Sequence, residues 1–276
     1  MISKGGFDAY AANVDSQGER AMERIRRFVG SLDFGGTYES RETARQMVRD
    51  YAYDVVTAYG DNAAAIAADY YDELARLAGA DVPSAVLAKA ANAEQIGKSV
   101  DYATRTIWDT DEGGFKTVIA DQIAANVSKM VGNRVRGMAN ETMYQNAKRN
   151  HNRFARVTTS KKPCAFCVML ASRGFAYLSE DSALLAHGIR KYHDDCYCKA
   201  VAAFDDEGLE GYDKADEYYD MYREATKQLP DADTREMWDA LSPEDQKSWK
   251  LEGQSAYSNF RTHALVTQMR DMYGLK

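Results

Sequence analysis

The four cysteines of the chain are gathered in one short region, and this clustering limits how that region folds. They lie within 35 residues, in the order Cys164-x2-Cys167-x25-His193-x2-Cys196-x-Cys198. Two thiolates separated by two residues bind one side of a tetrahedral ion from a single turn, and a His-x2-Cys turn supplies the other side. The spacing therefore predicts a zinc site.

Five candidate ligands compete for four positions around such an ion. Cys164, Cys167 and His193 form the firm part of the set, and either Cys196 or Cys198 completes it. The His-x2-Cys spacing repeats the Cys-x2-Cys spacing and favours Cys196, whereas Cys198 begins a strand-like run and competes with it. A zinc ion with four protein ligands has no open position for water, so we expect a structural site rather than a catalytic one.

A disulfide and a redox dithiol are the alternatives to zinc. A redox Cys-x2-Cys typically follows a strand and begins a helix at its first cysteine, with no second ligand cluster. Here Lys161, Lys162 and Pro163 precede Cys164, and polar residues interrupt any strand. Residues 157–204 carry few large apolar side chains, and metal binding contributes on the order of 10 kcal/mol to the folding of such a segment.

The composition indicates a globular chain with a sizeable core. At 276 residues and 45% hydrophobic, it is long enough for two or three units. No run reaches the roughly 18 uncharged apolar residues of a membrane span, and the first residues lead into no apolar signal region. We therefore expect a cytosolic protein, in which thiols stay reduced and metal binding is favoured over disulfides.

Charge is distributed unevenly along the chain. Residues 129–162 contain nine lysines and arginines against one acid, whereas residues 205–245 contain fifteen acids against four bases. The basic block is typical either of a solvated helix face or of a surface that meets nucleic acid or an acidic partner. Its helical members Arg134, Arg136, Lys148 and Arg149 are the candidates for non-specific contact with DNA phosphates.

Apolar residues recur at helical spacing over most of the first 150 residues. Ser16 and Glu19 form a predicted capping box that begins the first helix. Further helices are expected from 44 to a stop at Gly60, from 61 to a stop at Gly79, from Pro83 to about 111, and from 115 to about 150.

The period changes to that of short strands after residue 152. Strands are expected at 154–158, 174–178 and 198–204, and helices at 215–227, 234–241, from Pro243, and at 257–272. The predicted fold class is α+β, mostly α. Its three predicted regions are a helical region (1–114), a zinc-binding module led by a long helix (115–205) and an acidic helical region (206–276).

The cysteine region resembles a known family. Residues 157–174, which read VTTSKKPCAFCVMLASRG, and residues 193–198, which read HDDCYC, are similar to the MuF-like head-morphogenesis proteins of tailed phages. That family shows Cys-x-x-Cys, a short loop with glycine and an aromatic residue, and a His-x-x-Cys-x-Cys ending. Many members read His-Pro-Asn-Cys-Arg-Cys, whereas this chain has Asp194, Asp195 and Tyr197 at those places. The resemblance covers about residues 115–205.

The resemblance implies a minor capsid protein that acts beside the portal during prohead assembly, with the virion as its final location and the host cytoplasm as its site of assembly. The flanking helices would then bind portal, scaffold or major capsid protein.

Two enzyme classes are the rivals of a structural role. An HNH-type nuclease would use His187 or His193 with Asp194 or Asp195 around a divalent ion. No asparagine and second histidine follow Cys198 at the required spacing.

A capsid maturation protease would need a nucleophile and a base, and no Gly-x-Ser-x-Gly motif accompanies any histidine. We therefore assign no catalytic residue. His151 and His263, on helical segments, are expected at the surface.

Overall fold

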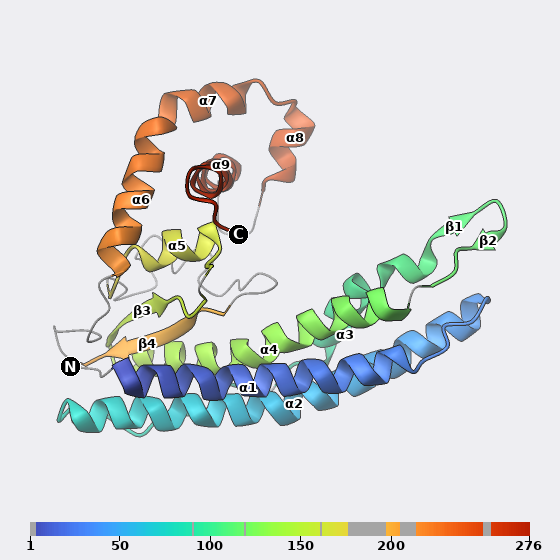
Figure 1. Cartoon of the computed structure of the whole chain (residues 1–276), viewed down its shortest axis with the longest axis horizontal. Helices are drawn as coiled ribbons and strands as arrows, with labels where there is room; N and C mark the ends of the chain where they lie inside the picture. Colours follow the sequence, from blue (N-terminus) through green and yellow to red (C-terminus); the bar gives the residue numbers. More distant parts are fainter. Residues whose placement is uncertain are drawn as a thin grey trace. The chain divides into compact units, whose positions relative to one another are not determined.

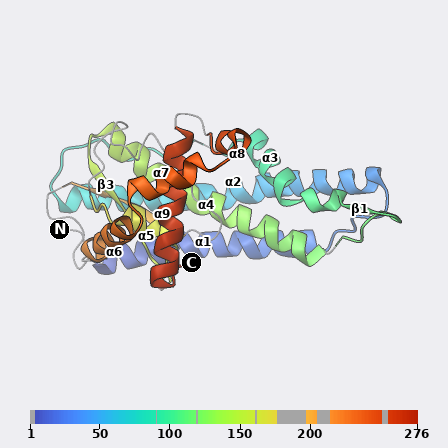
Figure 2. The same ribbon diagram turned by 90° about the horizontal axis from the view of Figure 1, so that it is seen from above.

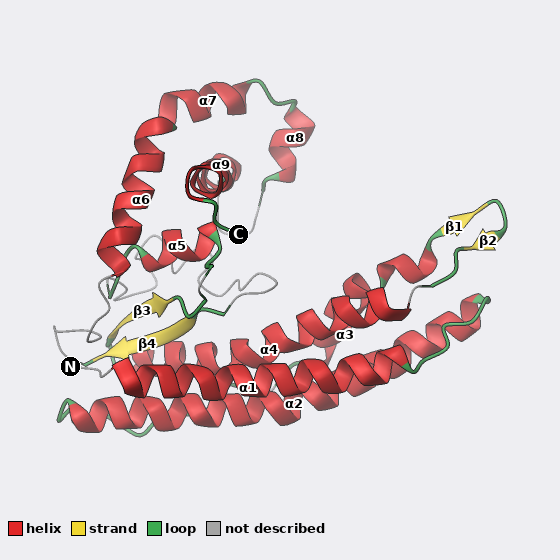
Figure 3. Ribbon diagram, in the orientation of Figure 1, coloured by secondary structure: helices red, strands yellow, loops and turns green. Residues whose placement is uncertain are grey.

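Helices make up most of the chain, with small antiparallel strand pairs beside them (Figures 1 and 3). The computed structural model describes residues 4–89, 91–118, 120–160, 162–175, 197–204, 214–250 and 255–276. The predicted α+β class with mostly helix is confirmed. Two compact units are present: residues 5–146 form the helical unit, and the described residues from 147 onward form the motif unit.

Three long helices build the helical unit: α1 (Lys4–Gly30), α2 (Tyr38–Leu77) and most of α4 (Ala120–Arg149). They lie side by side in both views (Figures 1 and 2). Tyr10 stacks on Tyr70 at a centroid distance of 4.4 Å and Phe28 lies 4.2 Å from Tyr51, so α1 and α2 are antiparallel. In the described part of the chain, no helix is both long enough and apolar enough to cross a membrane.

The first helix starts well before the predicted capping box, and Ser16 lies inside α1 rather than at its N-terminus. Phe7, Tyr10 and Val14 are buried and extend the apolar stripe that continues at Ile25. A helix cap contributes about 1 kcal/mol, whereas burial of several large side chains contributes more than that. The continuous buried stripe therefore decides where α1 begins, and the capping-box prediction is wrong.

The predicted stop at Gly60 is also wrong, because α2 continues through it to Leu77. Gly60 is buried, and a Cβ atom placed there would lie 3.0 Å from Cγ of Met138 on α4. Glycine at this position allows α2 and α4 to approach closely. Gly79 does follow the end of α2, as predicted, with φ of +63°.

The segment after Gly79 runs along α4 without helical structure, so the helix predicted to begin at Pro83 is absent there. The Asn146 side chain on α4 accepts a hydrogen bond from Val86 N at 2.9 Å and donates one to Val86 O at 2.8 Å. Thr142 Oγ1 accepts a hydrogen bond from Ala88 N at 3.0 Å. These side chains form hydrogen bonds with the N–H and C=O groups of the extended backbone, as a neighbouring strand would. Helix α3 (Ala93–Ala103) begins later, with Asn92 as its N-cap.

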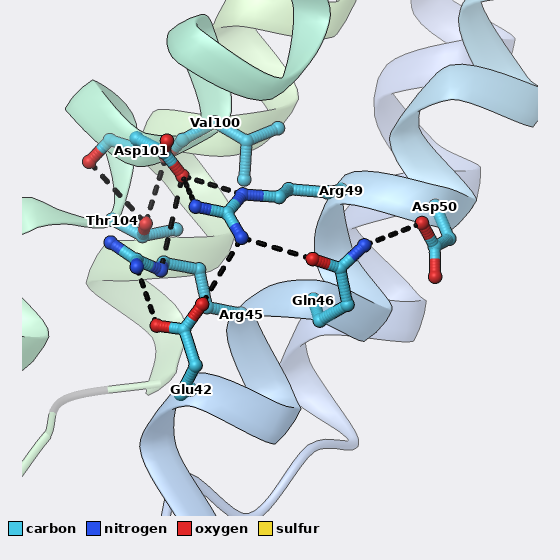
Figure 4. A network of polar contacts seen from close by, with 8 residues as sticks. All are labelled: Glu42, Arg45, Gln46, Arg49, Asp50, Val100, Asp101 and Thr104. Atoms are coloured by element: carbon cyan, nitrogen blue, oxygen red, sulfur yellow. Dashed lines mark hydrogen bonds and ion pairs between the residues drawn. The ribbon is translucent and has the colours of Figure 1, made fainter. Parts of the chain in front are cut away.

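Ion pairs join α2 to α3 near the start of α2 (Figure 4). Arg49 lies 2.6 Å from Asp101 and 3.1 Å from Glu42, and Arg45 pairs with Glu42 as well. The Arg45 guanidinium also lies 5.0 Å from the ring centroid of Trp108. Exposed pairs contribute little by themselves, but these side chains are 17–37% exposed and share partners, which favours a network.

A buried arginine holds the end of the helical unit together. Arg41 is 2% exposed and donates from Nε to Gly35 O at 3.1 Å, from one terminal nitrogen to Lys116 O at 2.8 Å and from the other to Ile107 O. Its guanidinium lies 4.6 Å from the Phe115 ring centroid. Arg41 thus joins α2 to the 3₁₀ helix η1 (Arg105–Trp108) and to the hairpin of β1 (Thr110–Asp111) and β2 (Gly114–Phe115). Because β2 occupies 114–115, α4 starts at Ala120 rather than at 115.

The motif unit combines a two-stranded ribbon with helices. Its elements are β3 (Arg153–Val157), α5 (Ala165–Ala171), β4 (Lys199–Ala203), α6 (Lys214–Gln228), α7 (Asp231–Asp239), α8 (Pro243–Ser248) and α9 (Ala256–Tyr273). The predicted strands at 154–158 and 198–204 and the four C-terminal helices are confirmed. At the strand predicted for 174–178, Gly174 and Phe175 lie in a turn, and residues 176–178 lie outside the described residues.

The acidic C-terminal helices belong to the same unit as the cysteine region rather than to a separate third region. Buried residues of α5, α6 and α9 form one cluster, which includes Val168, Leu170, Tyr218, Val266 and Met269. The acidic side chains of α6 lie on the exposed face, so the charge of this region does not prevent its apolar face from packing on α5. The residues on both sides of the predicted boundary at 205/206 therefore belong to the motif unit. The chain passes from the helical unit to the motif unit between residues 146 and 147.

Removal of the Asp15 carboxylate tests how the helical unit satisfies a buried charge. Arg136 on α4 is 3% exposed, and its Nε lies 3.2 Å from Asp15 Oδ1 on α1. Asp15→Ala should lower the free energy of unfolding by about 3 kcal/mol, measured by urea denaturation, because a buried cation loses a counter-charge.

The control is Glu23→Ala, also on α1, where the pair with Arg27 is 68–74% exposed. This change should cost less than about 1 kcal/mol. Equal losses for the two variants would contradict a special role for the buried pair.

Candidate metal centre

The antiparallel pairing of β3 and β4 brings the two halves of the cysteine motif to one end of a ribbon. Val157 pairs with Lys199 and Arg153 with Ala203. The chain that leaves β3 toward Cys164 therefore starts opposite Cys198, which directly precedes β4. Beyond the ribbon, Thr159 Oγ1 donates to Tyr197 O at 2.7 Å and continues the contact between the two segments. Residues 38 to 50 positions apart in sequence are thus held side by side.

The first two cysteines form one turn at the start of α5. Cys164 is the N-cap of this helix, and its Sγ accepts a hydrogen bond from Cys167 N at 3.1 Å. The Cys-x2-Cys spacing therefore equals the spacing from an N-cap to the third helical residue. Both thiols belong to the same turn, as a chelating pair requires.

Burial distinguishes the three described cysteines. Cys167 is 3% and Cys198 4% exposed, whereas Cys164 is partly exposed. All three are thiols in this structure and none is half of a disulfide.

The predicted ligand set extends beyond what the structure describes, because His193 and Cys196 lie outside the described residues. Within the described ranges, no group of three or more His, Cys, Asp or Glu side chains is arranged to hold a metal ion. Cys164, Cys167 and Cys198 thus do not form a three-ligand site by themselves. The donor chemistry of the Cys164–Cys167 turn fits zinc, and metal binding by all five candidate ligands stays a prediction.

One feature of the structure agrees with the redox alternative, and another does not. A helix does begin at Cys164, as in redox dithiols. However, β3 ends at Val157 and no strand leads directly into Cys164, which agrees with the polar residues between them.

Two buried cations lie on the ribbon beside the cysteine region. Arg156 on β3 is 1% exposed and Lys199 on β4 is 0% exposed. Lys199 Nζ donates to Tyr197 O at 2.7 Å, next to Cys198. The basic block includes Arg156, but its burial removes it from any solvated basic face. The sequence feature that could have indicated this burial is the position of Arg156 among apolar strand residues, such as Phe154 and Val157.

The candidates for DNA contact divide between surface and interior. Arg134, Lys148 and Arg149 are exposed on α4, and Arg134 donates to Ser99 Oγ at 2.7 Å. Arg136 is buried and paired with Asp15, so it is removed from the predicted phosphate-contacting set. Arg136 is only two residues from Arg134 in the sequence, but its side chain faces α1.

The two enzyme alternatives depend mostly on residues that the structure does not describe. His187, His193, Asp194 and Asp195 lie outside the described residues. His151 and His263 are exposed, as predicted; His151 follows α4 with φ of +54°, and His263 lies 5.1 Å from the Trp249 ring.

Comparison with known proteins gives one family. A family model described as VG15 protein matches residues 1–225, which include the helical unit and the cysteine region. No curated protein and no solved structure matches the chain significantly.

Substitution of Cys164 separates its capping role from metal binding. In the presence of a strong chelator, Cys164→Ser should be nearly as stable as the wild type, because serine also accepts the hydrogen bond from Cys167 N. Cys164→Ala should lose about 1 kcal/mol more, measured by chemical denaturation. Equal stability of the alanine and serine variants would contradict the cap.

Proposed function

The chain belongs to the VG15 protein family, a phage-type family that indicates a phage protein, and we propose that its role is a structural one in phage head morphogenesis. In this proposal the protein is a minor capsid component of the MuF-like type. It acts near the portal during prohead assembly and DNA packaging, and it remains in the virion, in the capsid interior or at the portal vertex.

The Cys164–Cys167 turn is the observation that carries this proposal. It belongs to the sequence run that resembles MuF-like proteins, and in the structure it begins helix α5, most of whose residues are buried in the core of the motif unit. We propose that zinc binds this turn together with His193 and either Cys196 or Cys198. The described donors support this by their chemistry: two thiols in one turn suit a structural tetrahedral ion.

The function would then reside in surfaces rather than in a reaction. The helical unit exposes aromatic side chains near the start of α2 and the end of α3: Tyr38 is 64% and Tyr102 68% exposed, and Tyr38 stacks on Trp108. Aromatic residues are enriched where proteins bind one another. We propose that such surfaces bind portal, scaffold or major capsid protein. The exposed Arg134, Lys148 and Arg149 would add non-specific contact with DNA.

Metal content is the first test of the proposal. Protein purified under reducing conditions should contain about one zinc ion per chain by mass spectrometry of metals. Cys167→Ser should lower the zinc content and the Tm together, because the metal stabilises the folded segment. Lys162→Ala, in the same loop with an exposed side chain, is the matched control and should change neither.

Absence of metal from fresh, reduced protein would contradict the site. A reversible disulfide between Cys164 and Cys167 in such a protein would favour the redox alternative instead.

Partner binding is the second test. Co-expressed with the portal and scaffold proteins of the same phage, the chain should be retained by at least one of them on an affinity column, and retention by neither would contradict the capsid role. Cleavage of DNA or of capsid protein that is lost in His193→Ala would favour an enzyme, either the HNH-type nuclease or the maturation protease.

A further inference from the structure

The C-terminal segment of the chain lies against the Cys164 turn. Ala165 N donates to Lys276 O at 3.0 Å, and Lys276 N donates to Pro163 O at 3.4 Å. The two bonds reach the residues on either side of Cys164, which is the pattern by which parallel strands pair. The backbone around Cys164 is therefore held from outside the cysteine motif.

A glycine directs the chain into this position. Helix α9 ends at Tyr273, and Gly274 follows with φ of +62° and ψ of +30°, the left-handed conformation in which helices commonly end. Leu275 then packs against the cluster of buried residues that includes Val168 and Met269. The reversal at Gly274 and the packing of Leu275 together place Lys276 beside Cys164.

Helix α9 couples this contact to the packing of the motif unit. Val266 and Met269 on α9 are buried in the same cluster as Ala165, Val168 and Met169 on α5. A displacement of α9 would therefore move Lys276 and the start of α5 relative to each other. Residues 226–276 lie beyond the matched range of the family model, so the contact involves a segment that this match does not include.

We propose that residues 274–276 position Cys164, and that docking of this segment and metal binding at the Cys164–Cys167 turn favour each other. The linkage rests on the zinc site of the proposed function. If the docked segment orders the turn, the ion binds more tightly to the docked state, and bound metal must in turn stabilise docking by the same free energy. The C-terminal segment is then a positioning element of the site although it supplies no ligand.

The test compares three variants of the full chain with the wild type. A chain that ends at Gly274 lacks Leu275 and Lys276 and loses both hydrogen bonds. Lys276→Pro lacks the N–H that donates to Pro163 O but keeps Leu275. Lys276→Ala keeps the backbone and is the matched control for loss of the lysine side chain. Circular dichroism establishes that each variant retains its helices.

Two readouts separate positioning from metal linkage. In metal-free protein, the rate of alkylation of Cys164 by iodoacetamide, resolved from Cys167 by peptide mass spectrometry, should rise several-fold in the shortened chain. The dissociation constant for zinc, measured by competition with a chromophoric chelator, should rise at least about fivefold. Lys276→Pro should change both in the same direction by less, and Lys276→Ala should change neither.

The outcomes decide the positioning role and the proposed zinc site separately. Unchanged alkylation and unchanged zinc affinity in a helical shortened chain would overturn the inference while leaving the zinc site intact. Changes of equal size in Lys276→Ala would also overturn it, because they would assign the effect to the side chain. If the wild type binds no zinc, the metal site and the linkage both fail, whereas faster alkylation of Cys164 in the shortened chain still supports the positioning role.

Discussion

The pairing of β3 with β4 is the contact on which the arrangement of the motif unit depends. It joins residues 153–157 to residues 199–203, and its register places Cys198 at the end of the ribbon from which the chain runs to Cys164. From that end, α5 begins at the Cys164 turn and packs its apolar face on α6 and α9. A shift of one residue in this register would move Cys198 to the other face of the ribbon, because side chains alternate along a strand.

Buried cations impose a second constraint, which acts in both units. Arg41 and Arg136 in the helical unit, and Arg156 and Lys199 in the motif unit, are at most 3% exposed. A buried charge destabilises a fold unless hydrogen bonds or counter-charges satisfy it. Arg41 donates to the carbonyls of three separate segments, and Arg136 pairs with Asp15 on a different helix. Arg41 and Arg136 thus connect separate segments of the helical unit. Because all four cations are buried, the net charge of a region only partly describes its surface.

Much of the fold follows from periodicity and local signals, but the failures share one cause. The strand at 153–157, the end of α4 at Arg149, and Pro243 at the start of α8 agree with the sequence-based expectations. Ser16, Gly60 and Pro83 were expected to begin or end helices, and none does. In each case a tertiary contact outweighs a local preference: a buried stripe at Ser16, the approach of Met138 at Gly60, and the side chains of Asn146 and Thr142 along the segment after Pro83.

The sequence by itself determined the residue types and spacing of the candidate metal donors and the mostly helical character of the chain, because each depends on residues close together in the chain. The tertiary structure alone decided that Cys167 and Cys198 are buried and that Arg136 faces α1 rather than solvent. It also decided that the backbone of Lys276 forms hydrogen bonds with the residues on either side of Cys164. These features depend on contacts between residues about 40 to 120 positions apart. Such contacts form through packing and hydrogen bonding between whole elements, and no local pattern encodes which elements meet.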